Sequence, residues 1–137
     1  MSKPARGIVF AHGDMARGMV DALRRISGAD EDAVVALSNE GLAPDALTAA
    51  VEELAGDAPA VVFTDLQAGS CAMAARLACR GQAGRVVVCG VNLAMLLDFV
   101  FHREMPLHEL ADRLVQKGRQ AVLCVPSSGG TAGDGAA

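Results

Sequence analysis

Short apolar runs alternate with amphipathic segments along most of this chain. The runs are typical of buried strands and cover residues 8–11, 33–37, 60–64, 85–90 and 120–125. Between the runs, apolar residues recur every three or four positions, as on the buried side of a helix. In the first such segment the predicted buried residues are Ala16, Met19, Val20, Leu23 and Ile26. The pattern therefore predicts a regular succession of strands and helices.

Polar residues and prolines mark the expected starts of the helices. Asp14, Ser70 and Asn92 are well placed to cap helices through their side chains. Pro44 and Pro106 suit the first turn of two others, where proline costs no hydrogen bond. In the helix after Ser70, the residues expected to face inward are Ala74, Leu77 and Ala78.

Strands separated by single helices predict a particular fold class. Right-handed crossovers give an α/β doubly wound, mostly parallel sheet with helices on both faces. The expected strand order is 2-1-3-4, and residues 1–125 form one domain. The Gly/Ala/Ser-rich tail, 126–137, has little to bury and is expected to be disordered.

The first and third strands end in polar residues that can act together. In this winding the ligand crevice lies outside the carboxyl ends of these strands, which brings His12 close to Asp65. A carboxylate that accepts a hydrogen bond from Nδ1–H would leave the Nε2 lone pair free as a nucleophile. The pair therefore predicts a histidine that carries a phosphoryl group.

The transferred group would need hydrogen-bond donors for its oxygens. Two helix amino termini can supply them, Gly13 and Asp14 on one side and Gly69 and Ser70 on the other. Such transfer depends on positioning and electrostatics, so we expect neither a metal nor a cofactor.

Composition excludes several classes of protein. A net charge of -4 without a Lys/Arg cluster argues against nucleic-acid binding. No apolar run approaches the roughly 20 residues of a membrane span, so a cytoplasmic protein without membrane insertion is expected. Four cysteines without a CxxC pair indicate reduced thiols rather than disulfides or a zinc site.

Three stretches resemble a known family: GIVFAHGDMARGM, VVFTDLQAGSCAMAAR and VVVCGVNLAMLLDF. They look like the mannose-family enzyme IIA of the bacterial phosphoenolpyruvate-dependent sugar phosphotransferase system, over residues 7–125. The resemblance implies that HPr phosphorylates His12 on Nε2 and that an enzyme IIB receives the group. It also assigns Asp65 to orient the ring, and Gly69 and Ser70 to hold the phosphate. Family members are homodimers in which a carboxyl-terminal strand, here 120–125, crosses to the partner.

Other interpretations remain open. Cys71 stands where many relatives have proline, and the sequence does not determine which sugar is transported. The phosphocarrier subunit of dihydroxyacetone kinase shares fold and chemistry, although its histidine is usually followed by serine. A regulatory phosphoprotein of the same fold is a further alternative.

Two unrelated activities are less well supported. A serine hydrolase using Ser70 would lack the G-x-S-x-G elbow and would need a hydroxyl that we expect to be engaged as a cap. Flavin binding is disfavoured by an aromatic content of only 3%.

Overall fold

The computed structural model describes residues 3–127 of the chain. Its strands form one parallel sheet in the order β2-β1-β3-β4. The strands are β1 (Arg6–Ala11), β2 (Val34–Ser38), β3 (Ala60–Thr64) and β4 (Arg85–Cys89). The helices are α1 (Met15–Ser27), α2 (Pro44–Ala55), α3 (Ser70–Cys79), α4 (Leu93–Val100) and α5 (Leu107–Gln120). The predicted fold class and strand order are confirmed.

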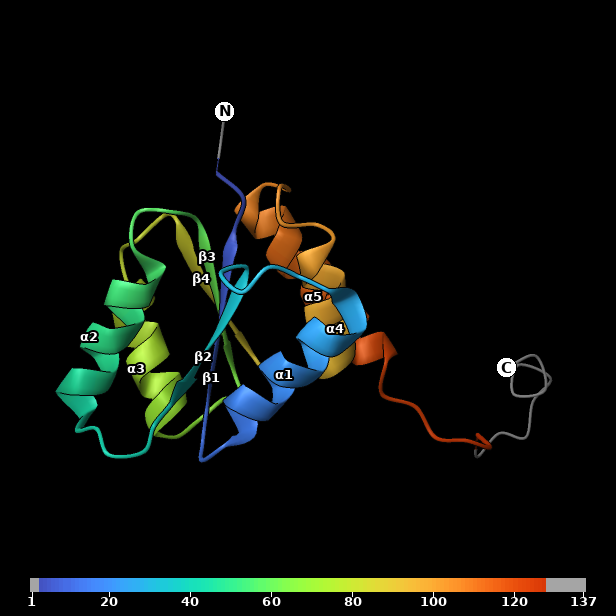
Figure 1. Ribbon diagram of the computed structural model, residues 1–137, viewed down its shortest axis with the longest axis horizontal. Helices are drawn as coiled ribbons and strands as arrows, with labels where there is room; N and C mark the ends of the chain where they lie inside the picture. Colours follow the sequence, from blue (N-terminus) through green and yellow to red (C-terminus); the bar gives the residue numbers. More distant parts are fainter. Residues whose placement is uncertain (1–2, 128–137) are drawn as a thin grey trace.

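Helices cover both faces of the sheet. Helices α2 and α3 lie on one face, and α1, α4 and α5 lie on the other (Figure 1). Successive side chains of β1 pack against the two helix layers in turn, because side chains point to alternate faces along a strand. Ile8 and Phe10 pack toward α2 and α3, whereas Val9 packs toward the other three helices. This two-sided burial explains why the strands are continuously apolar.

Two predicted buried side chains are instead exposed. Ile26 is 62% exposed because the buried face of α1 ends at Leu23, one turn earlier. Leu77 is 45% exposed because it lines a groove between α2 and α3 instead of facing the sheet. The spacing of apolar residues identified both helices correctly but overestimated how much of each helix surface is buried against the rest of the protein.

Of the three predicted capping side chains, only that of Asn92 caps its helix. Its side chain accepts a hydrogen bond from the Met95 amide at 2.9 Å, from an extended backbone with φ -135° and ψ 165°. Asp14 has φ -92° and ψ 4°, makes no capping bond and pairs with Arg17 instead. Ser70 is the first residue of α3, and the capping position belongs to Gly69. The predictions that Asp14 and Ser70 cap their helices were wrong. A capping side chain reaches the first amides from an extended backbone, and neither residue has one.

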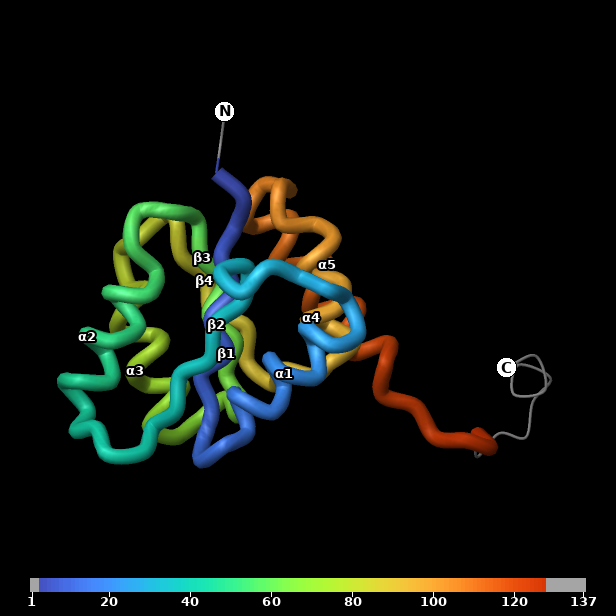
Figure 2. Tube along the Cα trace, in the orientation of Figure 1, coloured from blue at the N-terminus to red at the C-terminus, as the bar shows by residue number. Residues whose placement is uncertain are grey.

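The predicted strand at 120–125 is not found in this chain. Gln120 ends α5, and residues 121–127 leave the body of the molecule without joining the sheet (Figure 2). Val122, Leu123 and Val125 are each at least 70% exposed. These side chains have the composition of a strand but no neighbouring strand within the chain. The disorder predicted for 126–137 falls almost wholly outside the described residues.

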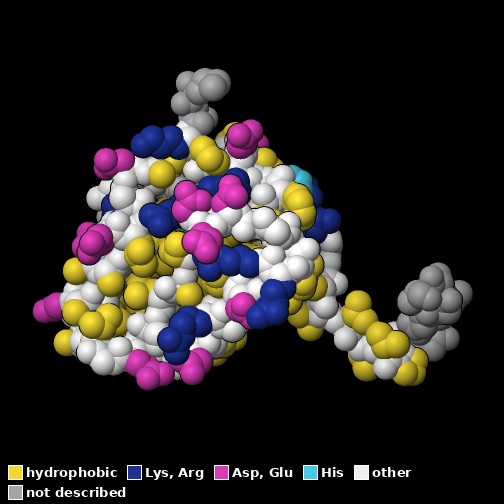
Figure 3. Space-filling view, in the orientation of Figure 1, with side chains coloured by type: hydrophobic (Ala, Val, Ile, Leu, Met, Phe, Trp, Pro, Cys, Tyr) yellow, Lys and Arg dark blue, Asp and Glu magenta, His cyan; other side chains and the backbone are white. Residues whose placement is uncertain are grey.

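The helices within residues 3–127 are too short or too polar to cross a lipid bilayer. On the face seen in Figure 3, acidic and basic side chains are interspersed, and neither sign forms a continuous patch. The same view shows hydrophobic side chains gathered on the projecting carboxyl-terminal segment.

Candidate phosphoryl-transfer site

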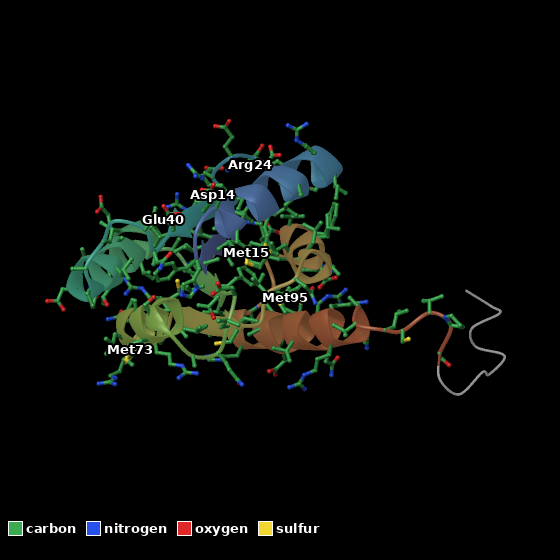
Figure 4. The ribbon with its side chains drawn as sticks, turned by 90° about the horizontal axis from the view of Figure 1, so that it is seen from below. Asp14, Met15, Arg24, Glu40, Met73 and Met95 are labelled. Carbon is green, nitrogen blue, oxygen red and sulfur yellow. The ribbon has the colours of Figure 1, made fainter. Side chains whose placement is uncertain are left out.

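His12 and Asp65 meet at the carboxyl edge of the sheet, as the sequence predicts. Each directly follows a central strand, β1 and β3 respectively, and these strands are paired in parallel. The His12 Nδ1 atom lies 2.7 Å from Asp65 Oδ2, although 53 residues separate the two positions. Figure 4 views the molecule toward this edge, from which α1 and α3 both start.

Asp65 holds the backbone as well as the ring of His12. Its Oδ2 also accepts a hydrogen bond from the His12 amide at 3.1 Å, and its Oδ1 accepts one from the Leu66 amide at 3.0 Å. The side chain of Asp65 is only 9% exposed, whereas that of His12 is 42% exposed. The carboxylate is therefore held in one position beneath a ring that remains open to solvent.

The charge of Asp65 determines which ring nitrogen carries the proton. Burial raises the pKa of this carboxyl, but hydrogen bonds from the ring and amide of His12 together outweigh it and lower the pKa below its ordinary value of 3.8. An ionised carboxylate only accepts hydrogen bonds, so Nδ1 must be the donor. In the neutral ring the lone pair then lies on Nε2, the nitrogen directed away from Asp65.

Thr64 stabilises the turn that presents Asp65. It is fully buried, and its hydroxyl donates a hydrogen bond to the Leu66 carbonyl at 2.8 Å. Its own carbonyl accepts hydrogen bonds from the amides of Gly90 and Val91 beyond the neighbouring strand. The only signal for this role in the sequence is a polar residue at the end of an apolar strand.

The start of α1 is held by the last residue of β2 and the residue after it. The Gly13 amide donates a hydrogen bond to Asn39 Oδ1 at 3.2 Å, and the Ser38 hydroxyl donates one to the Gly13 carbonyl at 2.8 Å. Gly13 has a φ of +60°, which favours glycine. Sequence reasoning missed Ser38 and Asn39, whose only signal is a polar pair at the carboxyl end of the second strand.

The start of α3 lies beside the reactive edge of the ring. A Cβ atom built on Gly69 would lie 3.8 Å from His12 Cε1 and 4.0 Å from Nε2. Gly69 has a φ of +101°, a conformation that a side chain would oppose. The amino terminus of a ten-residue helix presents unpaired amides and a partial positive charge, both of which favour an anion.

Cys71 completes the immediate surroundings of the ring. It is fully buried in the first turn of α3, and its Sγ lies 3.9 Å from His12 Nδ1. Burial raises the pKa of this thiol to about 11, aided by the charge of Asp65 and opposed by the Ser70 hydroxyl. The thiol is therefore neutral at physiological pH. Sequence reasoning treated Cys71 as a departure in the loop and did not place it against the ring.

A mostly apolar groove adjoins the site between α2 and α3. Its volume is about 230 Å³, and it begins at Gly69 and Ser70. Met73 and Leu77 line it from α3, and Thr48 lines it from α2. Met73 is 64% exposed and lies on α3, across the sheet edge from Asp14 and Met15 (Figure 4). The histidine is thus bordered by a surface suited to contact with another protein.

Solved structures show which class of protein this fold defines. The chain resembles the phosphotransferase system component EIIA from Streptococcus agalactiae, with a TM-score of 0.81, 23% identity and coverage of 88% of this chain and 97% of the other. It also resembles the mannose/sorbose specific IIA subunit from Enterococcus faecalis, with a TM-score of 0.76, 28% identity and coverage of 89% and 95%. The fold is that of phosphotransferase-system IIA components.

The sequence itself carries the assignment to a family. Residues 7–115 match the family model EIIA-man, described as the PTS system fructose IIA component. A search of curated proteins gave no match. The chain therefore belongs to the EIIA-man family, and the resemblance found in its sequence is confirmed. It is a phosphotransferase component with a phosphocarrier role in a sugar phosphotransferase system.

Proposed function

We propose that this protein accepts a phosphoryl group from phospho-HPr on Nε2 of His12 and donates it to an enzyme IIB. The observation that carries the proposal is the 2.7 Å contact between His12 Nδ1 and Asp65, which assigns the free lone pair to Nε2. Nε2 belongs to a ring that is 42% exposed, so a partner's phosphohistidine can approach it.

The proposed transfer exchanges one nitrogen–phosphorus bond for another. The Nε2 lone pair attacks phosphorus, and the bond to the donor's nitrogen breaks with its electron pair returning to the donor ring. The His12 ring gains positive charge while Nδ1 keeps its proton, and the ionised Asp65 stabilises that charge. Transfer to enzyme IIB is the same step with this protein as the donor.

The phosphoryl oxygens are held chiefly by the start of α3. Gly69 leaves room for a phosphoryl group beside Nε2, and the Ser70 amide and hydroxyl add donors. Gly13 can add its amide only by giving up its bond to Asn39, and Asp14 can contribute its amide. All four predicted phosphate-binding residues thus have a place in the proposal, with unequal roles.

The carboxyl-terminal segment completes a homodimer in this proposal. In a second copy, residues 120–125 would pair with β4, which is the edge strand of the sheet. The exposed Val122, Leu123 and Val125 provide the apolar side chains of such a strand. A chain truncated after Gln120 should then sediment as a monomer, and a truncated chain that remained dimeric would refute this arrangement. We place the protein in the cytoplasm, where HPr and enzyme IIB act, without bound nucleic acid.

Intact mass spectrometry tests the carrier function directly. The protein is incubated with phosphoenolpyruvate, enzyme I and HPr and then kept at mildly alkaline pH. We expect one acid-labile phosphoryl adduct that is absent in His12→Ala and retained in His108→Ala, which replaces an exposed histidine of α5. No adduct in the unaltered protein with a matching HPr, or an adduct surviving in His12→Ala, would refute the proposal.

The acceptor distinguishes the remaining alternatives. Added enzyme IIB should remove the adduct within the time of a mixing experiment. Discharge only to the other subunits of dihydroxyacetone kinase would assign the protein to that system instead. An adduct that no acceptor discharges would indicate the regulatory role.

A further inference from the structure

Three potential metal ligands from separate parts of the chain meet beneath the His12 ring. His12 follows β1, Asp65 follows β3, and Cys71 lies in the first turn of α3. One ligand atom from each lies within 4.8 Å of the other two. Among residues 3–127 this is the one such group of three. The proposed transfer uses His12 and Asp65 but gives the thiol no part.

The ligand types fit a tetrahedral zinc site, and so does the separation of the sulfur and nitrogen atoms. Zinc binds imidazole nitrogen, carboxylate oxygen and thiolate sulfur, and its ligand atoms lie about 3.5 Å apart. The observed distance of 3.9 Å between Cys71 Sγ and His12 Nδ1 is close to this value. The distance of 2.7 Å between Nδ1 and Asp65 Oδ2 is that of a hydrogen bond and must widen when an ion replaces the shared proton.

We propose that a thiophilic divalent cation of the zinc type binds between His12 Nδ1, the Asp65 carboxylate and the Cys71 sulfur. Binding moves the ring proton from Nδ1 to Nε2 and releases the thiol proton to solvent. The fourth ligand is water.

The bound ion makes His12 unable to accept a phosphoryl group, a consequence that rests on the proposed function. With the proton on Nε2, this nitrogen has no lone pair for attack. Conversely, a ring phosphorylated on Nε2 keeps its proton on Nδ1 for Asp65 and offers the ion no nitrogen ligand. Metal binding and phosphorylation therefore exclude each other at one residue.

The thiol makes this a reversible inhibitory site. Cys71 is fully buried, so an ion that binds its sulfur must give up most of its hydration shell. That cost lowers the affinity relative to a site built from exposed thiols. A protein with proline at this position would lack the sulfur ligand altogether.

Cobalt titration tests the site without any phosphorylation. The protein used carries Cys124→Ser, because Cys124 is an exposed thiol that could bind cobalt elsewhere. We expect one equivalent of Co²⁺ to produce a sulfur-to-cobalt charge-transfer band that Zn²⁺ then abolishes. Adding Cys71→Ser or His12→Ala should remove the band and weaken cobalt binding by about 100-fold. Loss of a residue that only supports a metal ligand already costs about 10- to 100-fold in affinity, and these variants remove a ligand itself. His108→Ala should keep it.

A second measurement covers the case in which a variant fails to fold. In the unaltered protein, Zn²⁺ should shift the ¹⁵N resonance of His12 Nδ1 to that of a metal-bound nitrogen and that of Nε2 to a protonated one. A charge-transfer band that persists in Cys71→Ser, or His12 resonances unchanged by excess Zn²⁺, would overturn the proposal.

The phosphorylation assay then separates this proposal from the carrier function. Zn²⁺ should suppress the phosphoryl adduct in the Cys124→Ser protein, and suppression should be lost when Cys71→Ser is added. A Cys71-dependent cobalt band in a protein that never forms an adduct would retain the metal site and refute the carrier. Normal phosphorylation in a protein that shows no cobalt band would support the carrier function and refute the metal site.

Discussion

Two helices begin at the same edge of the sheet, yet their first residues differ in what they offer an anion. At α1 the Gly13 amide is already bonded to Asn39, and Asp14 adds an exposed carboxylate. At α3 the capping residue is Gly69, no side chain caps the helix, and Nε2 of His12 lies beside it. Helix direction alone makes the two ends equivalent. Their side chains differ, and for this reason the proposed function assigns the larger share of phosphate binding to the start of α3.

The largest effect should come from Asp65, which holds both the ring and the backbone amide of His12. We expect Asp65→Asn to slow phosphoryl acceptance by about 100-fold, because a neutral amide does not stabilise the charged ring and can favour the other tautomer. Quenched-flow phosphorylation measures the rate. Asp57, an exposed residue after α2, provides the control Asp57→Asn, and equal rates in this variant and Asp65→Asn would contradict the role of Asp65.

Glycine-to-alanine changes at the two helix starts should differ by about tenfold in their effect on the rate of phosphorylation. Gly69→Ala places a methyl group 3.8 Å from the ring, at a φ that opposes it. Gly13→Ala places its methyl group 3.8 Å from Glu40 Oε1, at a φ of +60°, and should cost about 1–2 kcal/mol of stability. The rate should change little, because the Gly13 amide is already bonded to Asn39. Thermal unfolding and phosphorylation rates on both variants separate the effects. A larger loss of rate in Gly13→Ala would reverse the assignment of the two ends.

Polar side chains at the two ends should have smaller and opposite effects. Ser70→Ala removes one donor and should slow phosphorylation by about threefold, whereas Asp14→Asn removes a negative charge and should speed it by less. The Asp14 effect should shrink in high salt, because that side chain is exposed. Steady-state labelling at two ionic strengths tests this, and a slower Asp14→Asn variant would contradict it.

The smallest expected effect is the contribution of Asp65 to stability in acid. The pKa of this carboxyl is lowered by folding, so its contribution is complete above the unfolded value near 3.8 and is lost as pH falls through the folded value. Urea unfolding should show Asp65→Asn less stable than the unaltered protein at neutral pH, with the gap closing below about pH 4. A constant gap down to pH 2 would show that the carboxylate charge does not stabilise the fold.

Local patterns determined the strands, the helices and the position of the site. Residues 60–64 are the third strand as predicted, and the other three strands agree to within two residues at either end. Strand order followed from helical crossovers, and that order brought His12 to Asp65. These features were accessible because periodicity and connection rules act within one strand–helix unit.

Tertiary structure decided which of several possible partners each polar group takes. Asp14 has the residue type and position of a helix cap, but its backbone is not extended and its side chain pairs with Arg17. The approach of Cys71 to His12 spans 59 residues and depends on how closely α3 packs against the sheet. The exposed side chains at 121–125 have no neighbouring strand in this chain, so their apolar pattern alone could not make a strand. Hydrogen bonds and burial between distant segments leave no periodic mark on the sequence, which is why only the folded chain reveals them.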